Sequence, residues 1–272
     1  MKEEHIRWID NHMKEADNCT KFLDELSDAV NEQFNVRYTM QQLSAALLRD
    51  SLTTKQLNLV PAEQDPAERE RFRRLLGQFQ AHQLLFLDES HIDWKRGCRQ
   101  NGRSQGGTPA IVRRFDTLGH TGSSTLKAVL SIRGIVASEV SKETVDAEDF
   151  TSFLIRRVLP QCERYPGVCS VIVFDGAEPH LHTMIEAAIQ EHQAGVLFVP
   201  MSAYSPDFNP IENCFFISKS RVVRRSRGMR GVDVGVQFEL AIHSAITPEI
   251  VCSLFRHAGI EVTAAEEEWA TS

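Results

Sequence analysis

The sequence predicts an α/β protein in which a mixed sheet flanked by helices follows a small all-helical region. Two apolar runs, at residues 84–88 and 171–175, have the length and composition of buried strands, and each ends on an aspartate. Segments with helical apolar spacing alternate with such runs in the later part of the chain, whereas residues 1–60 show helical patterns alone. This order indicates an α/β architecture preceded by a helical region.

The composition is that of an ordinary globular protein. The 272 residues are 42% apolar and 25% charged, which is enough for one domain of ordinary size and a smaller one. The six cysteines form no Cys-x-x-Cys pair, so we expect neither a zinc site nor a disulfide framework, and a reduced, intracellular compartment. The N-terminus lacks the apolar run of a signal peptide. No segment approaches the roughly 18 apolar residues of a membrane span, so no membrane partner is expected.

The distribution of charge is more informative than the net charge of −7, which by itself disfavours nucleic-acid binding. Acidic residues concentrate near both ends of the chain. Basic residues form two clusters, and the alternative is that both clusters are solvated faces. The first cluster comprises Lys95, Arg96, Arg99, Arg103, Arg113 and Arg114, and the second comprises Lys219, Arg221, Arg224, Arg225, Arg227 and Arg230.

The region before the first strand divides into a helical part and a connecting part. Residues 1–60 contain an amphipathic helix that starts near Phe22 and a second helix that starts with the capping-box pattern Thr39-x-x-Gln42. Residues 61–82 contain a proline-bounded linker and a charged helix over 67–81. The apolar side of this helix is expected to consist of Phe72, Leu75, Leu76 and Phe79.

The remaining elements are expected in the following order. Further strands are predicted over 126–132 and 135–140, joined as a hairpin, and over 196–199. Helices are predicted over 150–159, with Asp146 and Asp149 as capping candidates, from Pro179 and from Pro210. Two short helices are expected to close the chain at 231–272, the last of them starting at Thr247 and ending at Gly259.

Three carboxylates are the candidate catalytic and metal-binding residues. Asp88 and Asp175 end the two apolar runs, and Glu212 lies in a helix whose expected N-cap is Asn209. Two strand-end aspartates and a helical glutamate can converge at one sheet edge and hold two divalent cations, an arrangement that performs in-line displacement at phosphorus. Each residue also has a structural interpretation, because such an aspartate can start a turn and Glu212 occupies a capping-box position.

Three blocks of this sequence resemble those of the mariner-like transposases and their bacterial insertion-sequence relatives. The blocks are Phe86-Leu-Asp88-Glu-Ser, Asp175-Gly-Ala-x-x-His180 and Tyr204-Ser-Pro-Asp-x-Asn-Pro-Ile-Glu212-Asn. The third block is long and specific, and the resemblance covers most of the chain. It implies a ribonuclease H-like DDE catalytic domain over 83–230 that cuts and rejoins DNA with two Mg²⁺ or Mn²⁺ ions. Asp88, Asp175 and Glu212 would be the ligands.

The resemblance also implies partners and further site residues. The substrates would be the double-stranded DNA of transposon ends and target, bound by a homodimer, in the nucleus of a eukaryote or in the bacterial cytoplasm. Residues 1–60 would be a partial helix-turn-helix-like DNA-binding region, so we expect a truncated N-terminus or a lost recognition half. His180 would lie near the site, and Lys219, Arg221, Arg224, Arg225 and Arg227 would contact DNA.

Departures from the family pattern leave alternatives open. Gly176 stands where asparagine is common, Phe215 stands where tryptophan is usual, and extra residues near Met201 lengthen the interval before Glu212. None of these departures removes a ligand. The alternatives to an active transposase are a domesticated or decayed transposase that only binds DNA, and a plain ribonuclease H-like nuclease. The negative net charge and the short N-terminal region favour the former, and the intact carboxylates oppose it.

Overall fold

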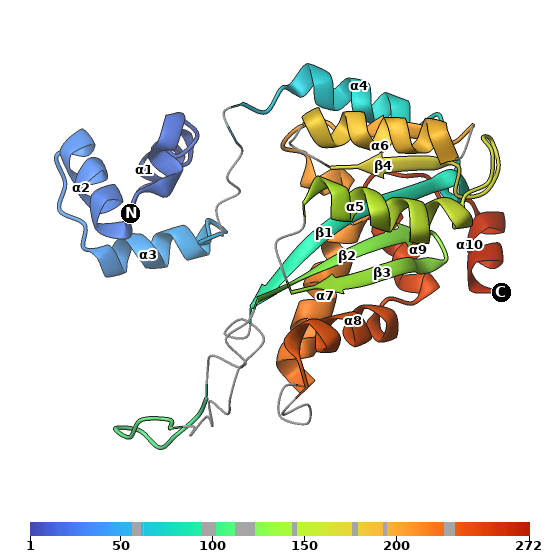
Figure 1. Cartoon of the computed structure of the whole chain (residues 1–272). Helices are drawn as coiled ribbons and strands as arrows, with labels where there is room; N and C mark the ends of the chain where they lie inside the picture. The colour runs from blue at the N-terminus through green and yellow to red at the C-terminus, as the bar shows by residue number, and fades with distance from the viewer. Residues whose placement is uncertain are drawn as a thin grey trace. The chain divides into compact units, whose positions relative to one another are not determined.

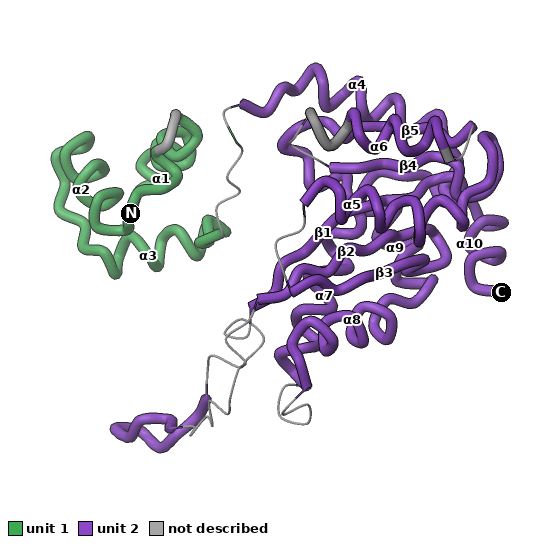
Figure 2. The backbone as a smooth tube through the Cα atoms, in the orientation of Figure 1, with its two compact units in different colours: residues 1–61 green, residues 62–272 purple. Residues whose placement is uncertain are grey.

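The chain forms two compact units, residues 1–61 and residues 62–272 (Figures 1 and 2). The computed structural model describes the backbone of residues 1–55, 61, 63–93, 102–111, 123–142, 146–175, 179–192, 195–225 and 232–272, with all of their side chains except those of residues 16, 17, 179–182 and 192.

The first unit is a small helical bundle. Its elements are α1 (Glu3–His12), a 3-10 turn (Ala16–Thr20), α2 (Leu23–Phe34) and α3 (Met40–Arg49). The predicted capping box starts α3, because the Gln42 side chain accepts from the Thr39 backbone at 3.0 Å and the Gln42 backbone donates to Thr39 Oγ1 at 3.3 Å. Helix α2 starts next to Phe22, as predicted, although the Phe22 side chain is 76% exposed and does not pack on the apolar face of the helix.

The second unit is built on a five-stranded sheet with the order β3-β2-β1-β4-β5. Neighbouring pairs β1–β2 and β2–β3 are antiparallel, whereas β1–β4 and β4–β5 are parallel. This mixed sheet confirms the predicted fold class, the ribonuclease H-like arrangement. The strands are β1 (Leu84–Asp93), β2 (Ser123–Ser131), β3 (Gly134–Ser141), β4 (Val171–Phe174) and β5 (Leu197–Pro200).

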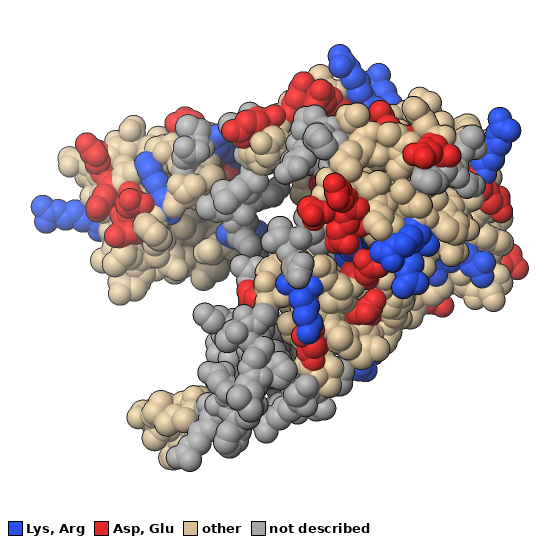
Figure 3. Space-filling model, in the orientation of Figure 1, with Lys and Arg blue, Asp and Glu red and all other residues tan. Residues whose placement is uncertain are grey.

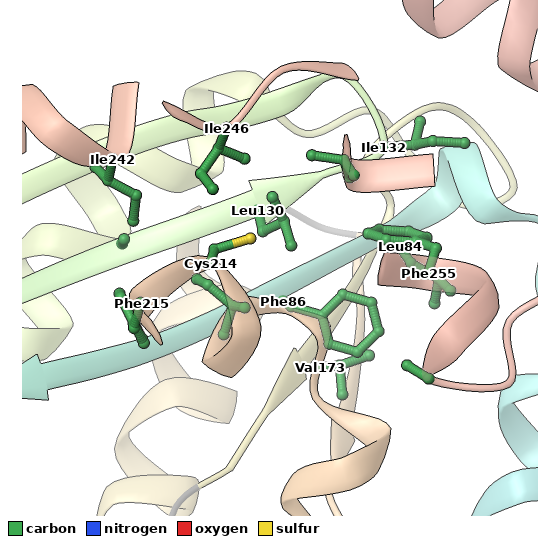
Figure 4. Close-up of a cluster of buried hydrophobic side chains, with 14 of the residues drawn as sticks. Leu84, Phe86, Leu130, Ile132, Val173, Cys214, Phe215, Ile242, Ile246 and Phe255 are labelled. Atoms are coloured by element: carbon green, nitrogen blue, oxygen red, sulfur yellow. The ribbon is translucent and has the colours of Figure 1, made fainter. Parts of the chain in front are cut away.

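Helices cover both faces of this sheet (Figure 1). One face packs against α5 (Ala147–Phe153), the short helical turns at 154–161, and α6 (Pro179–His192). The other face packs against α7 (Pro210–Arg225), α8 (Val234–Ala245) and α9 (Pro248–His257), and the same cluster includes side chains of α4 (Pro66–Leu76) and α10 (Ala264–Thr271). Side chains alternate along a strand, so Leu84 and Phe86 point to the α7 face (Figure 4). Leu85 and Leu87 point to the α5 face.

Helices α4 and α10 differ from the sequence predictions. Helix α4 ends at Leu76, so Phe79 lies beyond it, and Leu75 is 37% exposed instead of packing on the apolar side. The chain also has a helix after Gly259 that we did not predict, α10, which begins with a capping box between Thr263 and Glu266. No single helix of the described residues is long and apolar enough to cross a membrane. Helices α8 and α9 together have the length and the apolar composition of a membrane span, but the chain bends by 89° between them.

Candidate active site

Asp88 lies inside β1, although the sequence analysis placed it at the end of a strand. The strand continues to Asp93 because β2 pairs with it antiparallel as far as Asp93 and Ser123. On the other side of β1, the parallel partner β4 ends at Phe174, which is paired with Leu87. Asp88 is therefore the first residue of β1 beyond the end of its parallel neighbour.

Asp175 directly follows β4 and so lies beside Asp88 at the same level of the sheet. The alternation of side chains places both aspartates on the α7 face, since Phe86 and Val173, two residues before each of them, belong to the cluster on that face. The sheet thus brings together the two carboxylates that the sequence assigned to one site.

Helix α7 brings the third carboxylate to the same face. It begins at Pro210 and carries Glu212 in its first turn. Asn209 precedes the helix, as expected of an N-cap residue, but its side-chain oxygen is buried and finds no hydrogen-bond partner among the described residues. The Asn209 amide instead donates through Nδ2 to Asp88 Oδ2 at 2.8 Å. The expected side-chain cap is therefore replaced by a direct link between the start of α7 and Asp88.

The pKa values indicate that the three carboxylates interact. The pKa of Asp88 lies well above its usual range, because burial disfavours the charged form and the charges of Glu212 and Asp175 add repulsion. A hydrogen bond from the Glu89 backbone to Asp88 Oδ1, at 2.7 Å, acts in the opposite direction. Burial also raises the pKa of Glu212, Asp175 raises it further, and Lys219 lowers it. Glu212 is more exposed to solvent than Asp88. We call Asp88, Asp175 and Glu212 the carboxylate trio.

The donor chemistry of the carboxylate trio fits a divalent cation. Hard carboxylate oxygens are the ligands that Mg²⁺ and Mn²⁺ favour, and a cation would relieve the repulsion that raises the pKa of Asp88. As the side chains stand, no group of three or more His, Cys, Asp or Glu residues in the described part of the chain is spaced to hold a metal ion. The trio therefore supplies suitable ligands near one another, and not a closed cage.

The predicted DNA-binding residues lie along α7. Lys219 faces α8, with its Nζ 5.6 Å from the centre of the Phe238 ring. The charge of Lys219 acts to lower the pKa of Glu212. The Nε of Arg221 is buried without a hydrogen-bond partner among the described residues. Arg224 and Arg225 are exposed at the end of the helix.

Other predicted residues lie partly or wholly outside the described part of the chain. Arg227, Gly176 and most of the first basic cluster are outside it, and His180 is described only as a backbone position in the first turn of α6. In the view of Figure 3, lysine and arginine side chains are interspersed with acidic ones over both units.

A buried cation that the sequence did not predict lies on the opposite face of the sheet. Lys127 of β2 is fully buried and forms ion pairs with Glu139 at 2.8 Å and with Asp149 at 2.7 Å. Asp149 was a capping candidate for α5, but Asp146 alone caps that helix, by accepting from the Asp149 backbone at 2.8 Å. The charged residue within the apolar run at 126–132 was the only signal that could have revealed this cluster.

A mixed sheet of this order, with carboxylates on adjoining parallel strands, is the fold class of ribonuclease H-like endonucleases. Residues 83–230, more than half of the chain, match the family described as DDE superfamily endonuclease. The chain belongs to this family. No curated protein sequence matches this chain.

Solved structures of the Mos1 transposase share the fold. The structure titled as the Mos1 strand transfer complex is 20% identical, with a TM-score of 0.56, over 93% of this chain and 77% of that chain. The structure titled as a pre-cleavage Mos1 transpososome is 20% identical, with a TM-score of 0.55, over 94% and 79%. The structure titled as the mariner Mos1 paired end complex with Mg is 21% identical, with a TM-score of 0.54, over 94% and 78%. At these identities the likeness is one of fold.

Proposed function

We propose that this protein is a DDE transposase that cleaves DNA strands and transfers them to new DNA with the help of Mg²⁺ or Mn²⁺. One observation carries this proposal most strongly. Asp88, Asp175 and Glu212 come from three separate segments of the family-matched region, and the charges of Asp175 and Glu212 both raise the pKa of the buried Asp88. A cluster of carboxylates with few compensating charges is costly in a folded protein unless cations occupy it.

The residues of the site have separate tasks in this proposal. The metal would be held by Asp88, Asp175 and Glu212. A bound metal would activate a water or a DNA 3′-hydroxyl and stabilise the leaving oxygen, and two ions are the arrangement that serves both purposes. The Asn209 amide and the Glu89 backbone each donate a hydrogen bond to one of the two oxygens of Asp88. Lys219 offsets part of the negative charge beside Glu212.

The proposed substrates are the DNA of transposon ends and of a target site. The similar Mos1 structures include a strand transfer complex and a paired-end complex with the left transposon end, which supports this class of substrate. The exposed Arg224 and Arg225 would contact phosphates. A homodimer on DNA would hold both ends together.

The experiment is cleavage of a duplex that carries the inverted repeat flanking the gene, followed by joining to a plasmid, with Mn²⁺ as the more permissive ion. Asp88→Asn, Asp175→Asn and Glu212→Gln keep side-chain shape and remove a ligand charge, so each should reduce both steps by at least about a thousandfold, a loss of ~4 kcal/mol in transition-state stabilisation. Glu148→Gln, an exposed carboxylate on α5 at the opposite face, is the matched control and should cut and join like the wild type.

Cleavage that survives Glu212→Gln would show that another carboxylate is the third ligand. A second candidate function is DNA binding without catalysis, which is supported by the spacing of the side chains, since no three His, Cys, Asp or Glu residues of the described part of the chain are placed to hold a metal ion together. A wild type that binds the repeat but does not cut it with any of the metals tested would establish that alternative. Cutting without joining would instead identify a plain nuclease.

A further inference from the structure

The segment that precedes α7 is held on one side by the connecting helix α4. We call residues 204–209 the motif loop, because they open the third sequence block. Arg69 of α4 forms a two-pronged ion pair with Asp207 of this loop, with Nη1 to Oδ1 at 2.9 Å and Nη2 to Oδ2 at 2.7 Å. Such a planar pair fixes orientation as well as distance.

Aromatic contacts and a further hydrogen bond strengthen this attachment. The Arg69 guanidinium carbon lies 4.5 Å from the centre of the Phe208 ring, whose centre is 5.8 Å from that of Phe72 on α4. Gln64, just before α4, donates to the backbone oxygen of Tyr204, the residue that takes a positive φ of 55° at the start of the motif loop. Several independent contacts therefore set the shape of the loop.

The other side of the motif loop holds Asp88. Asn209 is 1% exposed and its Nδ2 donates to Asp88 Oδ2, while its buried Oδ1 has no partner among the described residues. Leaving a buried amide oxygen unpaired costs about 1–3 kcal/mol. A residue chosen for packing alone would avoid this cost, so the amide points to a role in orienting the carboxylate.

We propose that Asn209 is a positioning residue for Asp88, and that the Arg69–Asp207 ion pair keeps Asn209 in place. The carboxylate of an aspartate rotates in a broad torsional well. The Asn209 amide restricts that rotation and presents the other Asp88 oxygen, together with the first turn of α7, to the site. The connecting helix thereby contributes to the geometry of the carboxylate trio without supplying a ligand. The metal-binding consequence rests on the proposed function.

The first test measures Mn²⁺ affinity by calorimetry and apo stability by denaturant unfolding on the full chain. Asn209→Leu keeps the branching and the number of heavy atoms of the side chain and removes both the donor and the unpaired oxygen, so the apo protein should stay as stable as the wild type or become more stable. Its Mn²⁺ affinity should fall by about 10-fold or more, the effect typical of removing a partner that orients a ligand. A merely structural residue would lower stability and leave the affinity of the folded protein unchanged.

A double-mutant cycle shows whether Asn209 acts through Asp88. In an Asp88→Asn background, Asn209→Leu should cause no further loss of Mn²⁺ affinity, and the effects of the two substitutions on apo unfolding should be non-additive. Additive effects, or wild-type affinity in Asn209→Leu, would overturn the proposal. If the wild type itself binds no Mn²⁺, the proposed function fails, and the apo cycle alone then decides whether Asn209 positions Asp88.

The second test addresses the ion pair. Arg69→Met and Asp207→Asn should each weaken Mn²⁺ binding several-fold, and neither should weaken it further in Asn209→Leu. Arg69→Lys should restore little, because lysine lacks the two-pronged geometry. Arg256→Met, which breaks an exposed pair with Glu267 in another part of the same unit, is the control and should leave the affinity unchanged. Equal losses in Arg69→Met and Arg256→Met would overturn the role of α4.

Discussion

Asp88 and Asp175 lie side by side although one is inside a strand and the other follows a strand's end. The pairing of Leu87 with Phe174 fixes this relationship, because it places the next residue of each chain segment at the same level of the sheet. The site therefore depends on the register of β1 and β4, and a slip by one residue would turn one aspartate to the opposite face.

Divalent cations should stabilise the second unit. A ligand at 100 times its dissociation constant adds about 2.7 kcal/mol to the unfolding free energy, and 1 kcal/mol raises the midpoint of a unit of this size by about 2–4 °C. Thermal melts with Mn²⁺, Mg²⁺ or EDTA measure this shift. Asp175→Asn should lose most of it and Glu148→Gln should keep it, so an equal shift in both variants would place the ion elsewhere.

The stability of the apo protein should depend on the ionisation of Asp88. Its pKa is raised in the folded state, so the folded state holds the proton more tightly than the unfolded chain does. Stability contributed by this group is present at low pH and is lost as pH rises from the ordinary aspartate pKa through the folded one. Each unit of pKa difference corresponds to about 1.4 kcal/mol.

Asp88→Asn removes this loss. Relative to the wild type, the variant should gain unfolding free energy as pH increases from 4 to 8 in EDTA, as measured by urea unfolding. A difference that is the same at every pH would show that Asp88 titrates normally in the folded protein. Added Mn²⁺ should reverse the order at pH 8, because the wild type alone keeps the full ligand set.

The end of α7 should bind DNA through phosphates. Replacing Arg224 and Arg225 by glutamine should weaken binding to unrelated duplexes to the same degree, and the slope of log affinity against log salt should flatten by about 1 for each lost contact. The matched control is the adjacent pair Arg156 and Arg157, exposed on the opposite face of the sheet. Slopes that change equally in both double variants would indicate a general charge effect.

Lys127 should stabilise the fold without taking part in the site. Lys127→Met leaves Glu139 and Asp149 without their buried partner, and both carboxylates keep some contact with water, so the expected loss is roughly 1–3 kcal/mol of unfolding free energy. Lys142→Met, at a position that is 74% exposed, should change stability by less than about 0.5 kcal/mol. Mn²⁺ affinity should stay the same in both variants. A large change of Mn²⁺ affinity in Lys127→Met would show that the Lys127 cluster on one face of the sheet affects the site on the other face.

The strands and the motif blocks could be predicted from the sequence because their signals are local. Apolar runs identified β1 and β4, and the Thr39 capping box identified the start of α3. The extension of β1 beyond Asp88 was missed because it depends on pairing with β2, a contact between distant parts of the chain. Helix α10 was overlooked although the pattern Thr263-x-x-Glu266 signals its start.

The neighbours of the carboxylates could not be predicted in the same way. The hydrogen bond of Asn209 to Asp88 joins residues 121 positions apart, and that of Arg69 to Asp207 joins residues 138 positions apart. A helix-start asparagine reads locally as a cap, and only the folded chain shows that its amide is used elsewhere. Burial of Lys127 likewise depends on a distant element, α5, whose Asp149 and Phe153 side chains lie against it.

The core around Phe86 determines how much of the chain must be kept in a shortened version of the protein. The family match ends at residue 230, but Phe255 packs against Phe86 (Figure 4), with ring centres 5.5 Å apart. The ring of Phe238 likewise lies 6.1 Å from that of Phe215 of α7. A fragment cut at residue 230 would expose these rings and free the helix that carries Glu212. The shortest piece worth expressing for crystals or inhibitor screening therefore runs from the linker to the final helix.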